Sequence, residues 1–193
     1  MLFLCSKLVI MLKFLSALVF KILGWSVVNH CQIPDKCVII AAPHTSNWDF
    51  LIGRCYWYLN DVDAKYFIKS ELFLPFLGKL IKLNGGIPVY RKSKNNVVDQ
   101  MVNYFNNNKN FILGMSPEGT RKKVDKWKTG FYHIAFKANV PIVLLKLDYS
   151  TKEVGVFNLF FPTGNFDKDM LFIQNKYENF KGKNLKNYNK KIF

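Results

Sequence analysis

The chain has 193 residues, which is enough for one domain. Half of the residues are apolar and 16% are aromatic, so the chain can bury a substantial core and is not a disordered tail. The 28 basic residues outnumber the 13 acidic ones, and the formal net charge of +15 indicates an anionic partner such as lipid headgroups, a phosphorylated substrate or nucleic acid. Only three of the basic residues are arginines: Arg54, Arg91 and Arg121.

The cysteines show no spacing typical of a metal site. Cys5, Cys31, Cys37 and Cys55 form no C-x-x-C pair. We therefore expect free thiols in a reducing compartment and no bound metal.

The N-terminal segment, residues 1–29, is the most apolar stretch, but Lys7, Lys13 and Lys21 interrupt it. It is too charged for a spanning helix of about 20 apolar residues, and it lacks the cleavage site of a signal peptide. On a helix the three lysines fall within a sector of roughly 120°. The apolar residues mainly opposite are Leu8, Met11, Leu12, Leu15, Leu18, Val19 and Ile22. We predict an amphipathic membrane-docking helix that lies in the bilayer interface, with Trp25 near headgroup depth. The alternative is a helix packed on the protein's own core.

Short apolar runs and helical stretches alternate through the rest of the chain. Strands are expected at 37–42, 65–68, 87–90, 110–114 and 140–147, with an antiparallel edge strand at 154–161. Helices are expected at 47–59, 71–83, 93–108 and 129–138. This alternation predicts an α/β domain over residues 30–175, with a mostly parallel central sheet flanked by helices. Residues 176–193 are expected to form a Lys-rich tail that is solvated or faces lipid.

The first polar cluster, His44-Thr-Ser-Asn-Trp-Asp49, directly follows an expected strand, where open α/β sheets place their sites. The two side chains would point in different directions on one helix. They can meet if His44 ends the loop and Asp49 lies in the first helical turn, where the helix dipole favours its ionised form. Asp49 would then orient one imidazole nitrogen and leave the other free to take a proton. The spacing of Ser46 and Asp49 also fits a capping box, which requires no catalysis.

Two further clusters carry glycines and end in the rare arginines. They are Gly85-Gly-Ile-Pro-Val-Tyr-Arg91 and Ser116-Pro-Glu-Gly-Thr-Arg121. Each can be an ordinary turn. Arginine, however, offers a planar fork that binds phosphate through two parallel hydrogen bonds, which lysine cannot copy. The use of arginine here therefore indicates phosphate recognition.

Four blocks follow one another in order across residues 38–145. They are His44-x-x-x-x-Asp49, Gly86-Ile-Pro-Val-Tyr-Arg91, Pro117-Glu-Gly-Thr-Arg121 and Val140-Pro-Ile-Val143. Their order and spacing resemble the four motif blocks of the glycerolipid acyltransferases, and most closely those of the 1-acylglycerol-3-phosphate (lysophosphatidate) acyltransferases. Lys69-Ser-Glu-Leu72 is similar to the lysine-containing block that these proteins carry between the first two motifs.

The resemblance implies a transfer of a fatty acyl group from acyl-CoA or acyl carrier protein to a glycerolipid hydroxyl, in phospholipid synthesis. His44 would be the general base and Asp49 would orient it, with no acyl-enzyme. The implied substrate-binding residues are Lys69, Gly86, Arg91, Glu118, Gly119, Thr120 and Arg121. Arg91 and Arg121 would hold the acceptor phosphate, with Lys69 a weaker candidate, and Glu118 and Gly119 would shape the acceptor pocket. The acyl chain is expected near Leu72, Phe73, Phe76 and Leu77, which a buried helix face would explain equally well.

The expected partners are a lipid bilayer and the acyl donor, with no cofactor beyond that co-substrate and no nucleic acid. The expected location is the cytoplasmic face of the inner or plasma membrane, held peripherally or monotopically. The favoured acceptor is 1-acylglycerol 3-phosphate; glycerol 3-phosphate, other lysophospholipids and amino or sugar lipids stay open as alternatives.

Three other classes of protein compete with this interpretation. A serine hydrolase is disfavoured because Gly114-Met-Ser116-Pro-Glu118 departs from the nucleophile elbow at its fifth position. A basic nucleic-acid-binding protein fits the charge but shows none of the known binding motifs. A catalytically silent lipid-binding protein would have little reason to keep both His44 and Asp49.

Overall fold

A seven-stranded sheet organises the chain, with strands in the order β1-β7-β6-β2-β5-β3-β4. The computed structural model describes residues 2–89 and 97–193, and side chains from Leu8 onward. The strands are β1 (Ser26–Val27), β2 (Lys36–Ala42), β3 (Ala64–Lys69), β4 (Gly86–Val89), β5 (Phe111–Met115), β6 (Ile142–Asp148) and β7 (Glu153–Phe160). The helices are α1 (Leu2–Leu23), α2 (Trp48–Leu59), α3 (Pro75–Leu83), α4 (Val97–Asn107), α5 (Gly130–Ala138) and α6 (Phe166–Tyr177), with short 3-10 turns η1 (Ser70–Leu72) and η2 (Leu185–Asn187).

The sheet is mixed, because β7 runs antiparallel to β6 while the other neighbouring strands are parallel. The predicted α/β class and mostly parallel sheet are confirmed, as is the antiparallel direction of β7. Its expected place at the edge is wrong. Ser26 and Val27 pair with Glu153 and Val154, so the short strand β1 covers β7. Two residues give too little pattern for a strand to be found in the sequence.

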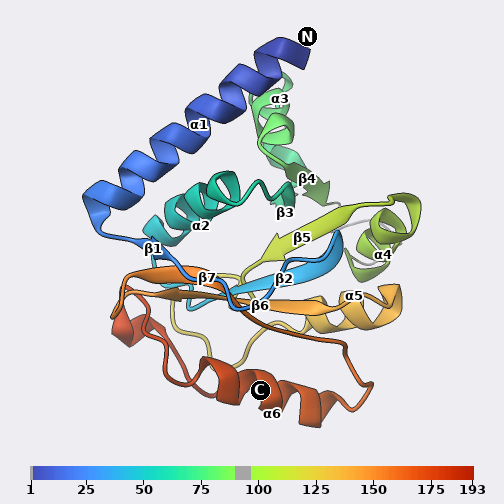
Figure 1. Cartoon of the computed structure of the whole chain (residues 1–193). Helices are drawn as coiled ribbons and strands as arrows, with labels where there is room; N and C mark the ends of the chain where they lie inside the picture. Colours follow the sequence, from blue (N-terminus) through green and yellow to red (C-terminus); the bar gives the residue numbers. More distant parts are fainter. Residues whose placement is uncertain (1, 90–96) are drawn as a thin grey trace.

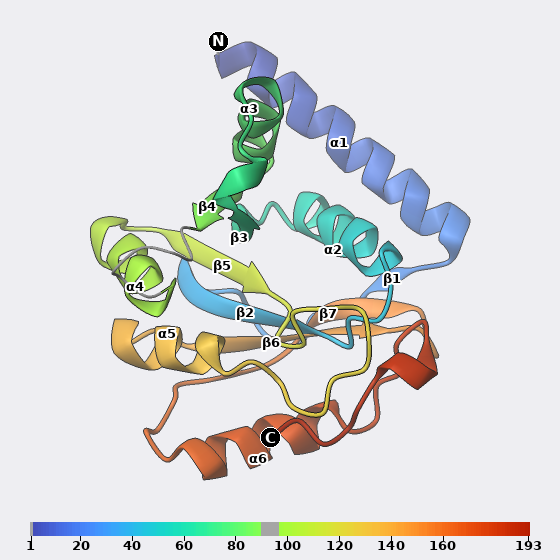
Figure 2. The ribbon, with the colours of Figure 1, turned by 180° about the vertical axis from the view of Figure 1, so that it is seen from behind.

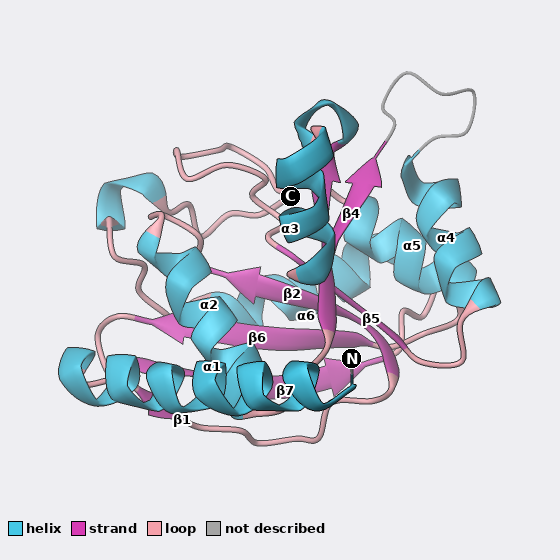
Figure 3. Cartoon of the chain, turned by 90° about the horizontal axis from the view of Figure 1, so that it is seen from above, coloured by secondary structure: helices cyan, strands magenta, loops and turns pink. Residues whose placement is uncertain are grey.

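Helices cover both faces of the sheet, as Figure 1 and the reverse view in Figure 2 show. Side chains alternate along β2, as in any strand buried on both sides. Cys37 and Ile39 join a core with α2 and the end of α1, whereas Val38 and Ile40 join a larger core with α4, α5 and α6. The view from above in Figure 3 shows α1, α2 and α3 on the near side of the sheet.

The N-terminal helix α1 ends at Leu23, earlier than the expected boundary of 29. Trp25, expected near lipid headgroups, is instead 9% exposed and packs in the core of the domain. Its ring meets Tyr149 edge-on, with centroids 4.8 Å apart. Within the described part of the chain, no helix is long and apolar enough to cross a membrane.

The C-terminal segment also differs from the expected separate tail. The helix α6, which was not predicted, runs to Tyr177 and thus crosses the boundary set at 175. Beyond it, Ile192 is fully buried, and the backbone carbonyl of Lys181 accepts a hydrogen bond from Tyr149 N at 2.8 Å. Residues 176–193 therefore pack against the domain, because apolar side chains placed between the lysines supply the contacts.

The α3 region was expected to form an acyl-chain wall or a buried helix face. The buried helix face is wrong, and the place of the acyl chain stays a prediction. Leu72, Phe76 and Leu77 are 49%, 81% and 44% exposed, and Gly78 is the only buried residue of α3.

Candidate active site

Three loops meet where the parallel strands β2, β5 and β6 end. His44 follows β2, the 116–121 loop follows β5, and Tyr149 follows β6. The carboxyl ends of parallel strands share one edge of the sheet, so chain segments far apart in sequence come together there. A cavity of about 410 Å³ opens at this edge, bounded by α2, β3, the end of β5 and the 119–121 loop.

His44 and Asp49 meet at this cavity, as the sequence predicts. Asp49 lies in the first turn of α2, and its Oδ2 is 3.2 Å from His44 Nδ1. The side chain of Asp49 is only 1% exposed, whereas that of His44 is 21% exposed. No described residue bonds to the other imidazole nitrogen, Nε2, so the ring is held on one side and free on the side that can take a proton.

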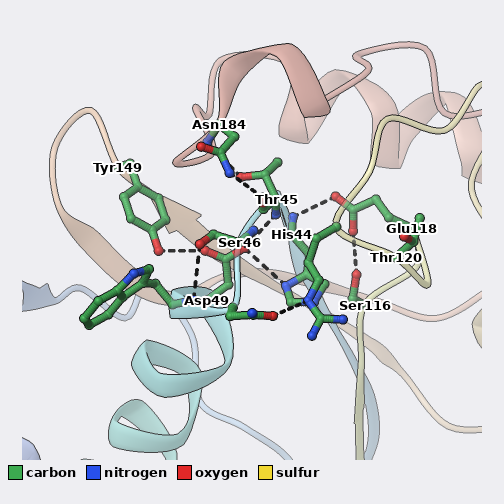
Figure 4. Close-up of polar contacts among 12 residues, drawn as sticks. His44, Thr45, Ser46, Asp49, Ser116, Glu118, Thr120, Tyr149 and Asn184 are labelled. Carbon is green, nitrogen blue, oxygen red and sulfur yellow. Dashed lines mark hydrogen bonds and ion pairs between the residues drawn. The ribbon is translucent and has the colours of Figure 1, made fainter.

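The carboxylate of Asp49 is fixed by more than the imidazole (Figure 4). Its Oδ2 accepts hydrogen bonds from the backbone N–H groups of Thr45 and Ser46, at 2.6 and 2.7 Å. Its Oδ1 accepts a hydrogen bond from the Tyr149 hydroxyl at 2.6 Å. The bond from Ser46 N is the half of a capping box that the sequence predicts. The same carboxylate thus closes the loop and orients the histidine.

Glu118 was expected to shape the acceptor pocket, but its side chain points elsewhere. It is 3% exposed and is not among the residues that line the cavity. One carboxylate oxygen accepts a hydrogen bond from His44 N at 2.8 Å, and the other accepts one from the Ser116 hydroxyl at 2.6 Å. Burial raises the pKa of Glu118, an effect that these hydrogen bonds and the nearby His44 oppose. Glu118 thus joins the 116–121 loop to the backbone of His44.

The end of the same loop does line the cavity, at Gly119, Thr120 and Arg121. Arg121 Nε donates to Asn47 Oδ1 at 2.6 Å, which fixes the guanidinium beside the start of α2. Gly119 has a φ of +64°, which favours glycine. A Cβ there would also lie 2.9 Å from Lys128 Nζ, so Lys128 extends across this glycine.

The remaining expected binding residues lie away from the cavity or outside the described part. Lys69 is exposed at the end of β3 and does not line the cavity. Gly86 is buried in β4, where a Cβ would lie 2.4 Å from Ile81, so it serves close packing. Arg91 lies outside the described residues.

Sequence reasoning missed several residues that line the cavity. Arg54, Lys65 and Lys128 add positive charge to it. Arg54 could have been predicted from the sequence, because it is one of only three arginines and lies five residues after Asp49 on the same helix. Lys128 gives no comparable signal, because it is one lysine in a lysine-rich loop. The apolar lining comes chiefly from Phe50, Trp57, Tyr66, Phe67 and Met115.

The described residues include no group of three or more His, Cys, Asp or Glu side chains arranged to hold a metal ion. The chemistry that the site can perform is that of a histidine–aspartate pair next to a basic, partly apolar cavity.

A sequence model of the family described as "Acyltransferase" matches residues 25–145. The chain belongs to the acyltransferase family. The match spans the His44–Asp49 pair, the 116–121 loop and most of β6. It ends before Tyr149.

Named relatives point to one branch of this family. The 1-acyl-sn-glycerol-3-phosphate acyltransferase of Saccharomyces cerevisiae is 31% identical over 144 residues, which cover 68% of this chain and 46% of that protein. The Escherichia coli protein of the same name is 30% identical over 97 residues, 47% of this chain and 39% of the relative. The chain thus spans less than half the length of these curated relatives.

A solved structure has the same fold. The 1-acyl-sn-glycerophosphate acyltransferase PlsC of Thermotoga maritima superposes with a TM-score of 0.60, over 89% of this chain and 77% of that one. The two are 18% identical, so the likeness concerns the fold.

Proposed function

We propose that this chain transfers a fatty acyl group from a thioester donor, acyl-CoA or acyl carrier protein, to the free hydroxyl of 1-acylglycerol 3-phosphate. The proposal rests on one observation: the buried Asp49 holds His44 at a cavity that is lined by both cationic and apolar side chains. The names of the relatives in Saccharomyces cerevisiae and Escherichia coli support the same reaction.

The free imidazole nitrogen of His44 would remove the proton of the acceptor hydroxyl as that oxygen attacks the thioester carbonyl. The tetrahedral intermediate would then collapse, forming the new ester and releasing the thiolate. The imidazolium would return its proton to that thiolate, so the histidine ends the cycle neutral. General-base assistance of this kind contributes roughly 10²- to 10⁴-fold, and positioning of the two substrates supplies much of the remainder.

The acceptor phosphate has two described partners that suit it. Arg121 offers its remaining guanidinium N–H groups, and Lys128, whose Nζ lies over Gly119, lines the same cavity. Arg54 and Lys65 also line the cavity, but Arg54 already donates to Asn84 and Lys65 pairs with Asp63. We therefore place the phosphate at Arg121 and Lys128, with Arg91 a further candidate.

The test is an acyl-transfer assay on the purified protein, with palmitoyl-CoA or palmitoyl carrier protein as donor. The acceptors are lysophosphatidate, glycerol 3-phosphate, lysophosphatidylcholine and monoacylglycerol, and mass spectrometry identifies the products. We expect phosphatidate from lysophosphatidate, and no product with His44→Ala. Absence of any acyl transfer, or full activity in His44→Ala, would refute the proposal.

We also propose that the protein docks peripherally or monotopically on an anionic bilayer, at the cytoplasmic face of the membrane. Large apolar side chains are exposed on α1, at the start of α2, and from the end of η1 through α3, more than a soluble surface usually carries. These residues are Leu8, Val9, Ile10, Met11, Phe14, Leu15, Leu18, Ile22, Trp48, Phe50, Leu51, Leu72, Leu74, Phe76, Leu77, Leu80 and Leu83. Figures 1 and 2 both show α1 and α3 rising from the same side of the sheet as α2.

The docking test compares two substitutions of exposed apolar residues. Phe14→Glu changes α1, and Leu171→Glu changes α6 on the opposite side of the sheet; the two side chains are 69% and 48% exposed. We expect Phe14→Glu to weaken co-sedimentation with vesicles of phosphatidylglycerol and phosphatidylethanolamine, and Leu171→Glu to leave it unchanged. Equal binding by the two variants and the unaltered protein would contradict docking through α1.

A further inference from the structure

Tyr149 reaches the catalytic pair from a part of the chain that none of the four motif blocks includes. It follows β6 in the turn toward β7, and its hydroxyl donates to Asp49 Oδ1 at 2.6 Å. Within the described part of the chain it is the only hydrogen-bond donor to that oxygen, since the other donors reach Oδ2. Figure 4 shows the phenol and the imidazole on either side of the Asp49 carboxylate.

The phenol is suited to act as a permanent donor. Burial raises the pKa of Tyr149 far above its ordinary value, and the hydrogen bond to Asp49 and the charge of that carboxylate raise it further. The hydroxyl therefore keeps its proton at any pH at which the enzyme would work. The Asp49 side chain is only 1% exposed, so water cannot donate a hydrogen bond to Oδ1, and the Tyr149 hydroxyl supplies that bond instead.

The turn that carries Tyr149 is itself held on two sides. Lys152 Nζ donates to Leu23 O at the end of α1, and Ser26 N donates to Lys152 O, so the turn is tied to the junction of α1 and β1. The Trp25 ring meets the phenol edge-on, at an interplanar angle of 88°. On the other side, Tyr149 N donates to Lys181 O. These contacts fix where the hydroxyl points.

We propose that Tyr149 is a positioning residue for the acyl transfer: its hydroxyl holds the Asp49 carboxylate in the rotation that keeps Oδ2 against His44 Nδ1. The inference rests on the proposed function. Without the hydroxyl, the buried Oδ1 has no donor, and the carboxylate is held through Oδ2 alone. It is then freer to turn, so Oδ2 holds the His44 imidazole less firmly while the substrate cavity is unchanged.

The test compares Tyr149→Phe with Tyr132→Phe. Tyr132 is the matched control, because its hydroxyl also donates to a buried aspartate, Asp169, at 2.9 Å, on the other face of the sheet. We expect Tyr149→Phe to lower kcat about ten-fold or more, with the KM for lysophosphatidate changed less than about two-fold. Tyr132→Phe should leave both constants unchanged. All assays are run below the melting temperatures, so that a loss of stability does not enter kcat.

A double-mutant cycle separates positioning from general damage. In an Asp49→Asn background, Tyr149→Phe should reduce the residual kcat less than about two-fold, because the carboxylate that it positions is already gone. A wild-type kcat in Tyr149→Phe would overturn the proposal. A loss of the same size in both backgrounds would overturn it too, since it would show a structural effect independent of Asp49.

A spectroscopic measurement distinguishes this inference from the proposed function. The ring nitrogen signals of His44, assigned by their loss in His44→Gln, should change in Tyr149→Phe and stay unchanged in Tyr132→Phe. If the unaltered protein transfers no acyl group, the proposed function fails, and this comparison still decides the role of Tyr149. Identical His44 signals in the two tyrosine variants would refute it.

Discussion

Two tyrosine–aspartate pairs lie on opposite faces of the sheet and are built in much the same way. Asp49 lies in the first turn of α2 and Asp169 in the first turn of α6, and both are buried. Asp49 accepts the hydroxyl hydrogen of Tyr149, and Asp169 accepts that of Tyr132. Each carboxylate also accepts backbone N–H groups of the loop before its helix, which for Asp169 is the N–H of Thr163.

Even the packing of the tyrosine rings matches. Tyr132 meets Phe166 edge-on at 5.1 Å, as Tyr149 meets Trp25 at 4.8 Å. Burial and the neighbouring aspartate raise the pKa of Tyr132 to about 12 and move that of Tyr149 in the same direction. The difference lies in the third partner. The Oδ1 atom of Asp169 accepts a hydrogen bond from the Thr163 hydroxyl, whereas Asp49 contacts the His44 imidazole and lines the cavity.

At both aspartates a buried carboxylate with several hydrogen bonds closes a loop onto the helix that follows it. Such a carboxylate becomes catalytic when a titratable ring occupies the remaining position and solvent or substrate can reach its far side. Matched substitutions at the two pairs therefore separate a structural role from a catalytic one.

The largest expected difference in kcat is between the two aspartate-to-asparagine variants. Asp49→Asn should lower kcat by roughly 10²- to 10⁴-fold, because the amide no longer stabilises the imidazolium or holds the correct tautomer. Asp169→Asn should leave kcat unchanged and lower the melting temperature. Steady-state kinetics and thermal unfolding of both variants check the contrast.

Two results would break this comparison. Equal losses of kcat in the two variants would show that both aspartates act through the stability of the fold. An active Asp49→Asn protein would remove the aspartate from the mechanism.

Next in size is the effect of removing Arg121. Arg121→Ala should raise the KM for lysophosphatidate about ten-fold or more and change kcat little, since a guanidinium–phosphate pair is lost. Monoacylglycerol, which has no phosphate, should show no such rise. The control is Lys168→Ala, an exposed cation at the start of α6, which should leave both KM values unchanged. A rise in KM for both acceptors would assign Arg121 to the shape of the loop instead.

The His44–Asp49 pair and the loop that faces it could be predicted from the sequence, because their residue types and spacing are those that general-base chemistry would require. The sequence did not contain the direction in which Glu118 points. A glutamate between glycine and proline in a polar turn can face a ligand or the backbone, and only the fold places His44 N within reach. Tyr149 was invisible for the same reason: it is one tyrosine after a strand, 100 residues from the aspartate that it contacts.

The fold was predictable where periodicity is strong, as in β2, α2 and β6. The prediction failed where charged residues interrupt the apolar periodicity. In α6, Met170, Ile173 and Tyr177 are fully buried at helical spacing, and Asn165 caps the helix by accepting from Lys168 N, yet the charged residues between them conceal the stripe. The sequence predicts that Trp25 contacts lipid, because nothing in it shows that Trp25 packs against Tyr149 in the folded protein.

A moderate effect is expected at Glu118, and it tests whether this residue binds substrate or fixes the site. Glu118→Gln keeps an oxygen for His44 N and an amide that can donate to the Ser116 hydroxyl, so kcat should fall only a few-fold. Glu118→Ala leaves His44 N without its partner and should lower kcat about ten-fold or more, with little change in the acceptor KM. A change in KM larger than the change in kcat would indicate that Glu118 binds the substrate. Steady-state kinetics on both variants decide this.

The smallest effect is expected at the aromatic rings that hold the two tyrosines. Trp25→Leu and Phe166→Leu each remove an edge-on ring contact, and such pairs contribute roughly 0.5 to 1.5 kcal/mol beyond the area that they bury. Both variants should therefore show a reduced free energy of unfolding in urea. Only Trp25→Leu should also lower kcat, by about two- to three-fold and less than Tyr149→Phe, because the phenol keeps its hydroxyl but is held less firmly. Trp25 lies two residues after the end of α1. A kcat effect there and none at Phe166 would therefore show that the junction between this helix and the sheet helps to align His44 and Asp49. Equal kcat in the two leucine variants would confine the role of Trp25 to packing.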